Sequence, residues 1–188
     1  MTNENFKIKL NKELSSLGNE FIILLNTDSK YYLDSVLETL KFMTDKRMGG
    51  VYLTSARPYG YMVKKFKEYN INNENLFFID AISGMVGKSP GEDGRCVFIE
   101  NPTALEEIGM WTNTLMDRIE VENKFLIVDS LSTMLIYNDV GALKEFSQFL
   151  INRLRLAGVS GIFTSIEMEI QMDFYGMMVA LCDKTIEI

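Results

Sequence analysis

Short runs of consecutive apolar residues recur along the chain, and most are rich in Val, Ile and Phe. Segments such as FIILL and FLIVD are apolar at successive positions instead of alternate ones. A parallel strand that helices cover on both faces has this pattern. The sequence therefore predicts strands at Phe21–Leu25, Val51–Thr54, Leu76–Asp80, Cys96–Ile99, Lys124–Asp129, Ser160–Ser165 and Lys184–Ile188.

The segments between these runs carry hydrophobic residues at helical spacing, as in the stripe from Leu33 to Leu40. Such a stripe can cover one face of a sheet. The two longest stripes run from Leu105 to Ile119 and from Leu143 to Ala157. The first follows a helix start at Asn101-Pro102, and the second precedes a helix stop at Gly158. We interpret Gly49-Gly50 as a further helix stop before a strand.

Regular alternation of strand and helix predicts an α/β fold, a three-layer αβα sandwich with a mainly parallel central sheet of about 6–7 strands. A length of 188 residues and a hydrophobic content of 47% suit a single domain over residues 1–188. Residues 1–19 are expected to form a helical segment. This segment either docks on the domain or extends from it as an arm.

Composition narrows the classes of function. The formal net charge of −7 argues against a nucleic-acid partner, because phosphate backbones are bound through positive surface. No stretch of about 18 consecutive apolar residues occurs, and the start lacks a signal-peptide pattern, so we expect a cytoplasmic protein without membrane insertion. The sequence has no histidine, which removes the most common general base and zinc ligand. Cys96 and Cys182 are expected to be reduced thiols, because they do not form a C-x-x-C pair.

Ligands of parallel α/β sheets bind beyond the carboxyl ends of the strands. In this sequence those ends carry a set of small, polar and charged side chains, and function should be sought among them. They are Asn26, Thr27, Asp28, Ser55, Ala56, Arg57, Asp80, Asp129, Ser130, Ser165 and Glu167.

Three stretches resemble a known family. The segment FLIVDSLSTML, Phe125–Leu135, with the later GVSGIFTSIEME, resembles the Walker B strand and the following strand of KaiC-like and RecA-like ATPases. The segment that begins GGVYLTSARPYG is similar to their second strand and helix. The resemblance covers roughly residues 20–188 and is densest with archaeal proteins. It implies a RecA-type fold, a tendency to form oligomers, and a match of Asp129 to the Walker B aspartate.

The phosphate-binding loop G-x-x-x-x-G-K-[ST] of that family has no counterpart here. The corresponding stretch is LLNTDSKYYLD, and it contains no glycine to close backbone N–H groups around a phosphate. We expect Asp28 or Ser29 to cap a helix that begins near Lys30, so that the protein's own carboxylate takes the anion position. Lys30 is either a remnant of the phosphate lysine or, as we favour, an exposed lysine of the first turn. No cofactor is therefore expected.

The acidic pair that activates water in the family is also missing, since Ala56 and Arg57 occupy that neighbourhood. Asp129 could form an acidic cluster with Asp80, Glu167 and Glu169 that binds a divalent cation through oxygen ligands. The alternative, which we favour, is that Asp129 accepts hydrogen bonds from the turn that follows its strand.

Gly87-Lys88-Ser89 imitates the end of a phosphate-binding loop, but Pro90-Gly91 follows and no helix can begin there. We interpret the whole segment from Ile82 to Arg95 as a flexible connection between strands.

These observations favour a non-catalytic protein that acts as an interaction or regulatory subunit, with another protein or a second copy as partner. One alternative is an ATPase or nucleotide switch that binds Mg-ATP through an unconventional site. Its candidate residues are Asn26, Thr27, Asp28, Ser29, Lys30, Asp129 and Ser130. Another alternative is a small-molecule sensor with its ligand at the same strand ends.

Overall fold

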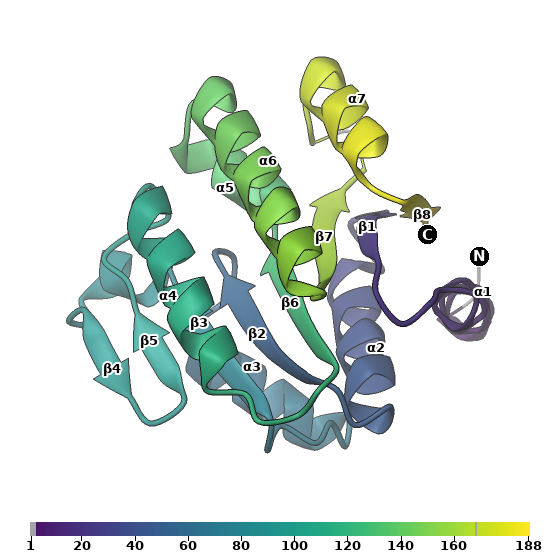
Figure 1. Cartoon of the computed structure of the whole chain (residues 1–188), viewed down its shortest axis with the longest axis horizontal. Helices are drawn as coiled ribbons and strands as arrows, with labels where there is room; N and C mark the ends of the chain where they lie inside the picture. Colours follow the sequence, from purple (N-terminus) through teal and green to yellow (C-terminus); the bar gives the residue numbers. More distant parts are fainter. Residues whose placement is uncertain (1–2, 168) are drawn as a thin grey trace.

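The computed structural model describes residues 3–167 and 169–188, and within them a central sheet separates two layers of helices (Figure 1). The sheet has eight strands in the order β4-β5-β3-β2-β6-β7-β1-β8, and every neighbouring pair is parallel except β4 with β5. The strands are β1 Ile22–Thr27, β2 Gly49–Thr54, β3 Leu76–Asp80, β4 Gly91–Asp93, β5 Cys96–Phe98, β6 Lys124–Asp129, β7 Ser160–Ile166 and β8 Lys184–Glu187. The helices are α1 Asn3–Ser15, α2 Tyr32–Asp45, α3 Tyr59–Glu68, α4 Leu105–Asp117, α5 Leu131–Tyr137, α6 Val140–Ala157 and α7 Met172–Leu181, with a 3-10 turn at Ser83–Val86.

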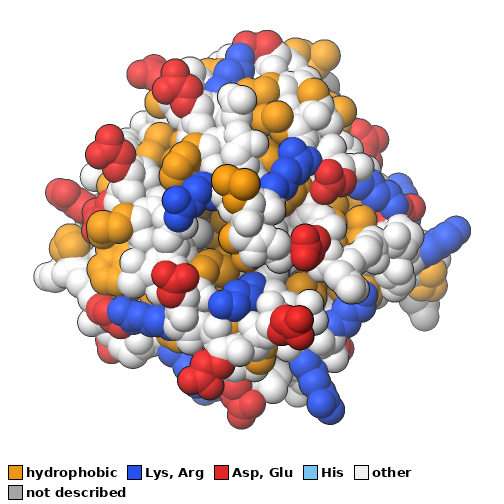
Figure 2. Space-filling view, viewed as in Figure 1, with side chains coloured by type: hydrophobic (Ala, Val, Ile, Leu, Met, Phe, Trp, Pro, Cys, Tyr) orange, Lys and Arg blue, Asp and Glu red, His pale blue; other side chains and the backbone are white. Residues whose placement is uncertain are grey.

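The two helical layers follow the order of the sequence. Helices α1, α2 and α3 pack on one face of the sheet, and α4, α5, α6 and α7 pack on the other. The second layer faces the viewer in Figure 1, and Figure 2 shows its surface, where charged groups of both signs surround hydrophobic side chains. The predicted three-layer αβα sandwich is confirmed.

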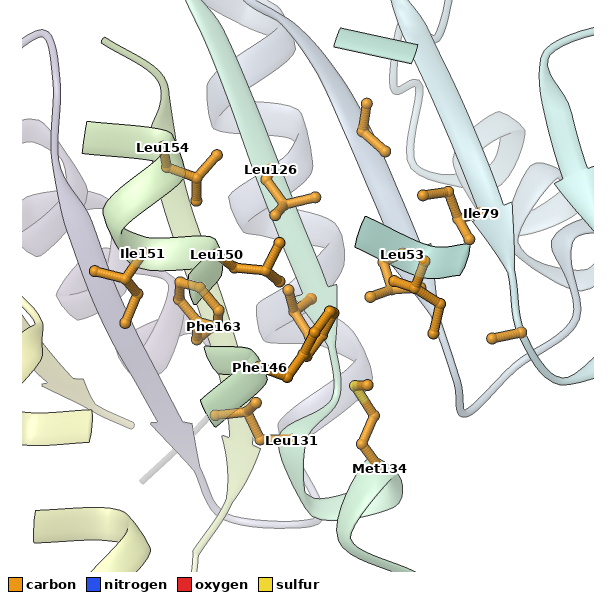
Figure 3. Packing of buried hydrophobic residues seen from close by; sticks show 14 of the residues in the cluster. Leu53, Ile79, Leu126, Leu131, Met134, Phe146, Leu150, Ile151, Leu154 and Phe163 are labelled. Carbon is orange, nitrogen blue, oxygen red and sulfur yellow. The ribbon is translucent and has the colours of Figure 1, made fainter. Parts of the chain in front are cut away.

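The side chains of successive strand residues point to opposite faces of the sheet. In β1, Ile22 and Leu24 belong to the core under α4–α7, whereas Ile23 and Leu25 belong to the core under α1–α3. Figure 3 shows the first of these cores, in which side chains of β6 and β7 meet those of α6. Both faces are buried, which is why the strands are apolar at successive positions.

The strands expected from the sequence are all present, with ends displaced by two residues at most. The count of about 6–7 strands was too low, because β4 was missed. The segment from Ile82 to Arg95 is not a structureless connection: it contains the turn Ser83–Val86 and then β4, which pairs with β5. All three residues of β4 are exposed and polar or glycine, so no hydrophobic pattern marks this strand.

Gly87-Lys88-Ser89 lies in this segment. Gly87 ends the 3-10 turn in the left-handed conformation, with φ of 96°. The Lys88 ammonium lies over the Phe98 ring, 4.4 Å from its centroid, and pairs with Asp93 at 3.7 Å.

Gly49-Gly50 is not a helix stop, as the sequence suggested, but the start of β2. A Cβ atom at Gly50 would lie 2.5 Å from the Phe125 ring of the neighbouring strand β6. Close strand packing therefore requires glycine here. Helix α2 ends earlier, where Arg47 adopts a positive φ of 60°.

The predicted stop at Gly158 is confirmed, since this residue caps α6 in the left-handed conformation with φ of 64°. The Asn101-Pro102 start is displaced, because α4 begins at Leu105. The Asn101 side chain instead accepts the Thr103 N–H at 2.9 Å in the turn before the helix.

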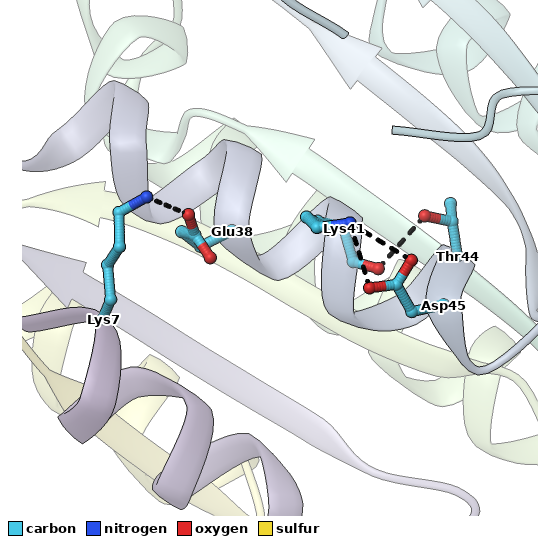
Figure 4. A network of polar contacts seen from close by, with 5 residues as sticks. All are labelled: Lys7, Glu38, Lys41, Thr44 and Asp45. Carbon is cyan, nitrogen blue, oxygen red and sulfur yellow. Dashed lines mark hydrogen bonds and ion pairs between the residues drawn. The ribbon is translucent and has the colours of Figure 1, made fainter. Parts of the chain in front are cut away.

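The N-terminal segment forms α1 and docks on this domain. Its apolar residues Phe6, Leu10 and Leu14 are fully buried. An ion pair between Lys7 and Glu38 joins α1 to α2, as Figure 4 shows together with the Lys41 contacts inside α2. No helix among the described residues is long and apolar enough to cross a membrane.

Candidate functional site

The carboxyl ends of the parallel strands meet at one edge of the sheet and bring several of the predicted residues together. The Ser55 N–H donates to the Asp129 carbonyl oxygen at 2.7 Å, so the ends of β2 and β6 are joined directly. The Ser165 hydroxyl donates to the Asn26 side-chain oxygen at 2.8 Å, which joins β7 to β1.

Asp129 is the last residue of β6 and is fully buried. One carboxylate oxygen, Oδ1, accepts the hydroxyl of Tyr32, and the other, Oδ2, accepts the hydroxyl of Tyr52. The Tyr32 hydroxyl also lies 2.6 Å from the Thr164 hydroxyl oxygen. Residues from α2 and β2 thus bind both oxygens of one carboxylate, and β7 contacts the first of these hydroxyls.

Both tyrosines belong to elements of regular secondary structure, which fix their positions. Tyr32 is the first residue of α2, and Tyr52 is in the middle of β2, where its side chain points to the α1–α3 face. Both rings are buried, with exposed fractions of 2% and 0%. The Thr164 hydroxyl is oriented by its donation to the Val128 carbonyl oxygen at 2.9 Å. The hydrogen-bonding partners of Asp129 are therefore fixed before any ligand arrives.

Burial and charge shift the acidity of the whole group. Burial raises the pKa of the Asp129 carboxyl, and the two tyrosine hydroxyls and the charge of Arg57 oppose this rise. The pKa values of Tyr32 and Tyr52 lie well above their ordinary value, first through burial and then through the Asp129 charge. The raised pKa values of the two tyrosines keep both hydroxyls protonated, so that each can donate a hydrogen bond to Asp129, whereas the raised pKa of Asp129 itself reflects the cost of burying its charge.

Arg57 supplies the positive charge of the site. Its backbone is held by Thr54, whose hydroxyl donates to the Arg57 carbonyl oxygen at 2.7 Å and accepts the Arg57 N–H at 3.1 Å. The guanidinium carbon lies 5.4 Å from the centroid of the Tyr32 ring. Its Nη1 atom is buried without a hydrogen-bond partner among the described residues.

The loop between β1 and α2 corrects one expectation. Helix α2 begins at Tyr32, close to the expected start near Lys30, but neither Asp28 nor Ser29 caps it through its side chain. The Asp28 carboxylate accepts the Lys30 N–H at 2.9 Å within the turn, and Ser29 is exposed. Lys30 is also exposed, and its ammonium lies 4.6 Å from the centroid of the Tyr31 ring.

The interpretation that Asp129 accepts hydrogen bonds from the turn after its strand is wrong. Its side chain does not bind the turn that follows β6 but hydroxyls from α2 and β2. The adjoining Ser130 has the role of a helix cap: its hydroxyl oxygen accepts the Thr133 N–H at 3.1 Å at the start of α5.

The structure does not gather Asp80 and Glu167 around Asp129. Asp80 accepts the N–H groups of Ile82, Ser83 and Tyr59 at 3.0, 2.8 and 2.8 Å, and the Ser83 hydroxyl at 2.6 Å. Glu167 is exposed. Within residues 3–167 and 169–188, no group of three or more acidic or cysteine side chains could hold a metal ion.

Sequence reasoning missed Tyr32 and Tyr52, the residues that decide the chemistry of the site. A signal was present for Tyr52, because its hydroxyl interrupts the apolar run GGVYLT and a buried hydroxyl needs a partner. Tyr32 had no comparable signal, since aromatic residues are common on the buried stripe of a helix.

Comparison with known proteins adds the family context. No protein-family model and no curated protein matches the sequence. A KaiC-like protein of the hyperthermophilic archaeon Pyrococcus horikoshii OT3 is similar in structure, with 12% identity and a TM-score of 0.60 over 89% of this chain and 70% of that one. The flagellar accessory protein FlaH of Methanocaldococcus jannaschii has 13% identity and a TM-score of 0.58, over 100% of this chain and 77% of that one. The chain has a RecA-like fold.

A third structure extends the comparison to a protein with a bound peptide. It is an uncharacterized protein of P. horikoshii in complex with an unknown peptide, with 11% identity and a TM-score of 0.70. The match covers 96% of this chain and 82% of that one. At such identities the likeness establishes the KaiC-like fold and nothing about ligands.

Proposed function

We propose that the chain is a non-catalytic KaiC-like protein that works through protein partners, as an interaction or regulatory subunit. The observation that carries this proposal is the state of Asp129. In the family that the sequence resembles, the matching aspartate serves Mg-nucleotide. Here both carboxylate oxygens are bound by the protein's own tyrosine hydroxyls, and no surface of the residue is exposed.

A magnesium ion does not fit this arrangement. Mg²⁺ requires oxygen ligands in near-octahedral geometry at about 2.0–2.1 Å and keeps several waters. Binding at Asp129 would require the Tyr32 and Tyr52 hydroxyls to leave a buried carboxylate. Each hydrogen bond to a charged group contributes about 1.5–3 kcal/mol, which the ion would have to offset before it gained anything.

The loop before α2 also fails as a phosphate cradle. It has no glycine, and the Asp28 carboxylate already takes the Lys30 N–H that would face an anion. A carboxylate at this position repels phosphate as well. This loop therefore offers no glycine-rich run of N–H donors of the kind that usually binds a nucleotide in this fold.

A protein partner is supported by two further observations. The net charge of −7 disfavours nucleic acid. One protein of the same fold was determined with a peptide bound to it. We carry this mode of action over to the present chain as part of the proposal.

The experiment is a thermal-unfolding titration with Mg-ATP and Mg-ADP. The expected result is an unchanged melting temperature at millimolar nucleotide, for the native protein and for Asp129→Asn alike. A ligand present at about a thousand times its Kd would add about 4 kcal/mol to the free energy of unfolding. Such a gain, abolished by Asp129→Asn, would contradict the proposal and favour the nucleotide switch.

A further inference from the structure

A groove of about 1040 Å³ lies between α4 and α6 on the α4–α7 face. Figure 1 shows these two helices side by side, and Figure 2 shows hydrophobic side chains gathered near the middle of the same face. The groove lies on the outer side of α4 and α6, so it belongs to no part of the Asp129 site.

The groove has an apolar floor that is open to solvent. Met110 from α4 is 55% exposed and Phe149 from α6 is 48% exposed, and Phe146 lies beneath them. The two rings lie close to Gly109, where a Cβ would be in ordinary contact at 3.5 Å from the Phe149 ring and 3.8 Å from the Phe146 ring. Exposed methionine and phenylalanine in one hollow are typical of surfaces that bind other proteins.

The charged residues that line the groove are acidic, and one basic group, the Arg153 guanidinium, lies at its margin, 5.9 Å from the centroid of the Phe149 ring. Glu106, Glu107 and Glu145 line it, and no lysine or arginine does. None of the three carboxylates forms an ion pair within the described part of the chain. Glu106 and Glu107 also lie in the first turn of α4, where they stabilise the helix dipole. Glu145 has no such role, because it lies in the interior of α6.

The walls determine the conformation of an occupant. Both walls are helices, whose backbone groups bond internally and leave no edge to which an extended peptide could add. A helix satisfies its own backbone hydrogen bonds and can pack its ridges into a groove between two other helices, which favours a helical occupant.

We propose that this groove docks an amphipathic helix of a partner protein that carries large apolar side chains on one face and lysine or arginine beside them. This inference rests on the proposed function, for which it supplies the surface and the chemistry of the partner. The apolar residues of the partner helix lie on Met110 and Phe149, and its basic residues face Glu106, Glu107 and Glu145.

The test is selection from two displayed peptide libraries against the whole protein, one restricted to helical and one to extended sequences. Expected binders come from the helical library and carry basic residues. Measured by fluorescence anisotropy, the selected peptide should bind M110A/F149A at least about tenfold more weakly. E106Q/E145Q should weaken binding several-fold and reduce its dependence on salt.

Two control variants separate the groove from the rest of the surface. Leu156→Ala removes a side chain on α6 that is 88% exposed and outside the groove, and Glu120→Gln removes an exposed charge. Both should bind the peptide within about twofold of the native protein. Unchanged circular dichroism and urea midpoints for M110A/F149A exclude loss of folding as the cause.

Several results would overturn the inference. They are the absence of any enriched peptide, enrichment of acidic or extended peptides, and binders that are indifferent to M110A/F149A. A dimer of the native protein that dissociates in M110A/F149A would place a second copy in the groove instead. The proposed function is tested independently of the groove. Stabilisation by Mg-ATP would refute the proposed function even if basic helical peptides bind the groove. If no peptide binds the groove, an unchanged melting temperature with nucleotide would still support the proposed function.

Discussion

Replacement of Tyr32 by phenylalanine tests the buried Asp129 site by removing a single hydroxyl group. The ring and its packing at the start of α2 are kept, and only the hydroxyl that donates to Asp129 is lost. A hydrogen bond to a charged group contributes about 1.5–3 kcal/mol, and Tyr52 still serves the other oxygen. We expect the free energy of unfolding to fall by about 2 kcal/mol at about pH 7.

The double variant Y32F/Y52F should lose more stability than either single variant. It leaves Asp129 as a buried charge with neither hydroxyl, a situation that typically costs about 3–5 kcal/mol. Protonation of the carboxyl relieves this penalty. Because burial already raises the pKa of Asp129, the loss in Tyr32→Phe should shrink as the pH falls through the titration of that group.

The assay is urea unfolding followed by circular dichroism between about pH 4 and pH 8, with Tyr61→Phe as control. Tyr61 is 41% exposed, and loss of its hydroxyl should change stability by less than about 0.5 kcal/mol. If Tyr32→Phe behaves like Tyr61→Phe, or loses the same amount at every pH, the account of Asp129 is refuted.

Three further predictions concern the two buried tyrosines at alkaline pH, the close strand packing at Gly50 and the buried thiol of Cys96. In the folded protein the pKa values of Tyr32 and Tyr52 are raised, whereas tyrosines of the unfolded chain lose their protons near about pH 10. The free energy of unfolding should therefore fall above about pH 10, with a slope of up to about 1.4 kcal/mol per pH unit for each tyrosine. Urea titrations at alkaline pH measure that slope, and a slope unchanged in Y32F/Y52F would contradict it. Gly50→Ala should lower the free energy of unfolding by about 1–3 kcal/mol, because the new Cβ meets the Phe125 ring. The control is Gly60→Ala in α3, where no atom lies within 4 Å of the new Cβ, and this change should be neutral or stabilising in the same urea assay. Burial raises the pKa of the Cys96 thiol, so iodoacetamide should label Cys96 only when the protein unfolds, and mass spectrometry that finds rapid labelling of the native protein would refute this.

The sequence was sufficient to predict the layers and most strands, because a strand buried on both faces must be apolar throughout. β6 illustrates this, since its predicted and observed ends coincide at Lys124 and Asp129. β4 escaped prediction because its residues are exposed and pair only through the backbone. Gly49-Gly50 was misinterpreted because glycine ends helices and also allows close packing between strands, and only the Phe125 ring distinguishes the two.

The site could be located but not described from the sequence. The rule for parallel sheets places Asp129, Ser55 and Ser165 at one edge, and they lie there. The partners of Asp129 depend on where Tyr32 and Tyr52 point after folding, and these residues are 20 positions apart in the chain and further still from Asp129. Side-chain partnerships of this kind arise from tertiary packing, which local patterns do not contain.

The two margins of the sheet bear on how copies of this molecule can meet. β4 presents glutamate and aspartate at one margin, and Glu92 there is bound by Arg118. At the other, the Lys9 ammonium donates to the Glu187 carbonyl oxygen of β8 at 2.6 Å, which uses a group that an incoming strand would need. Charged or covered margins discourage edge-to-edge aggregation of sheets. Any assembly of copies is therefore expected to form through helical faces, and fibrillar stacking is disfavoured even at high protein concentration.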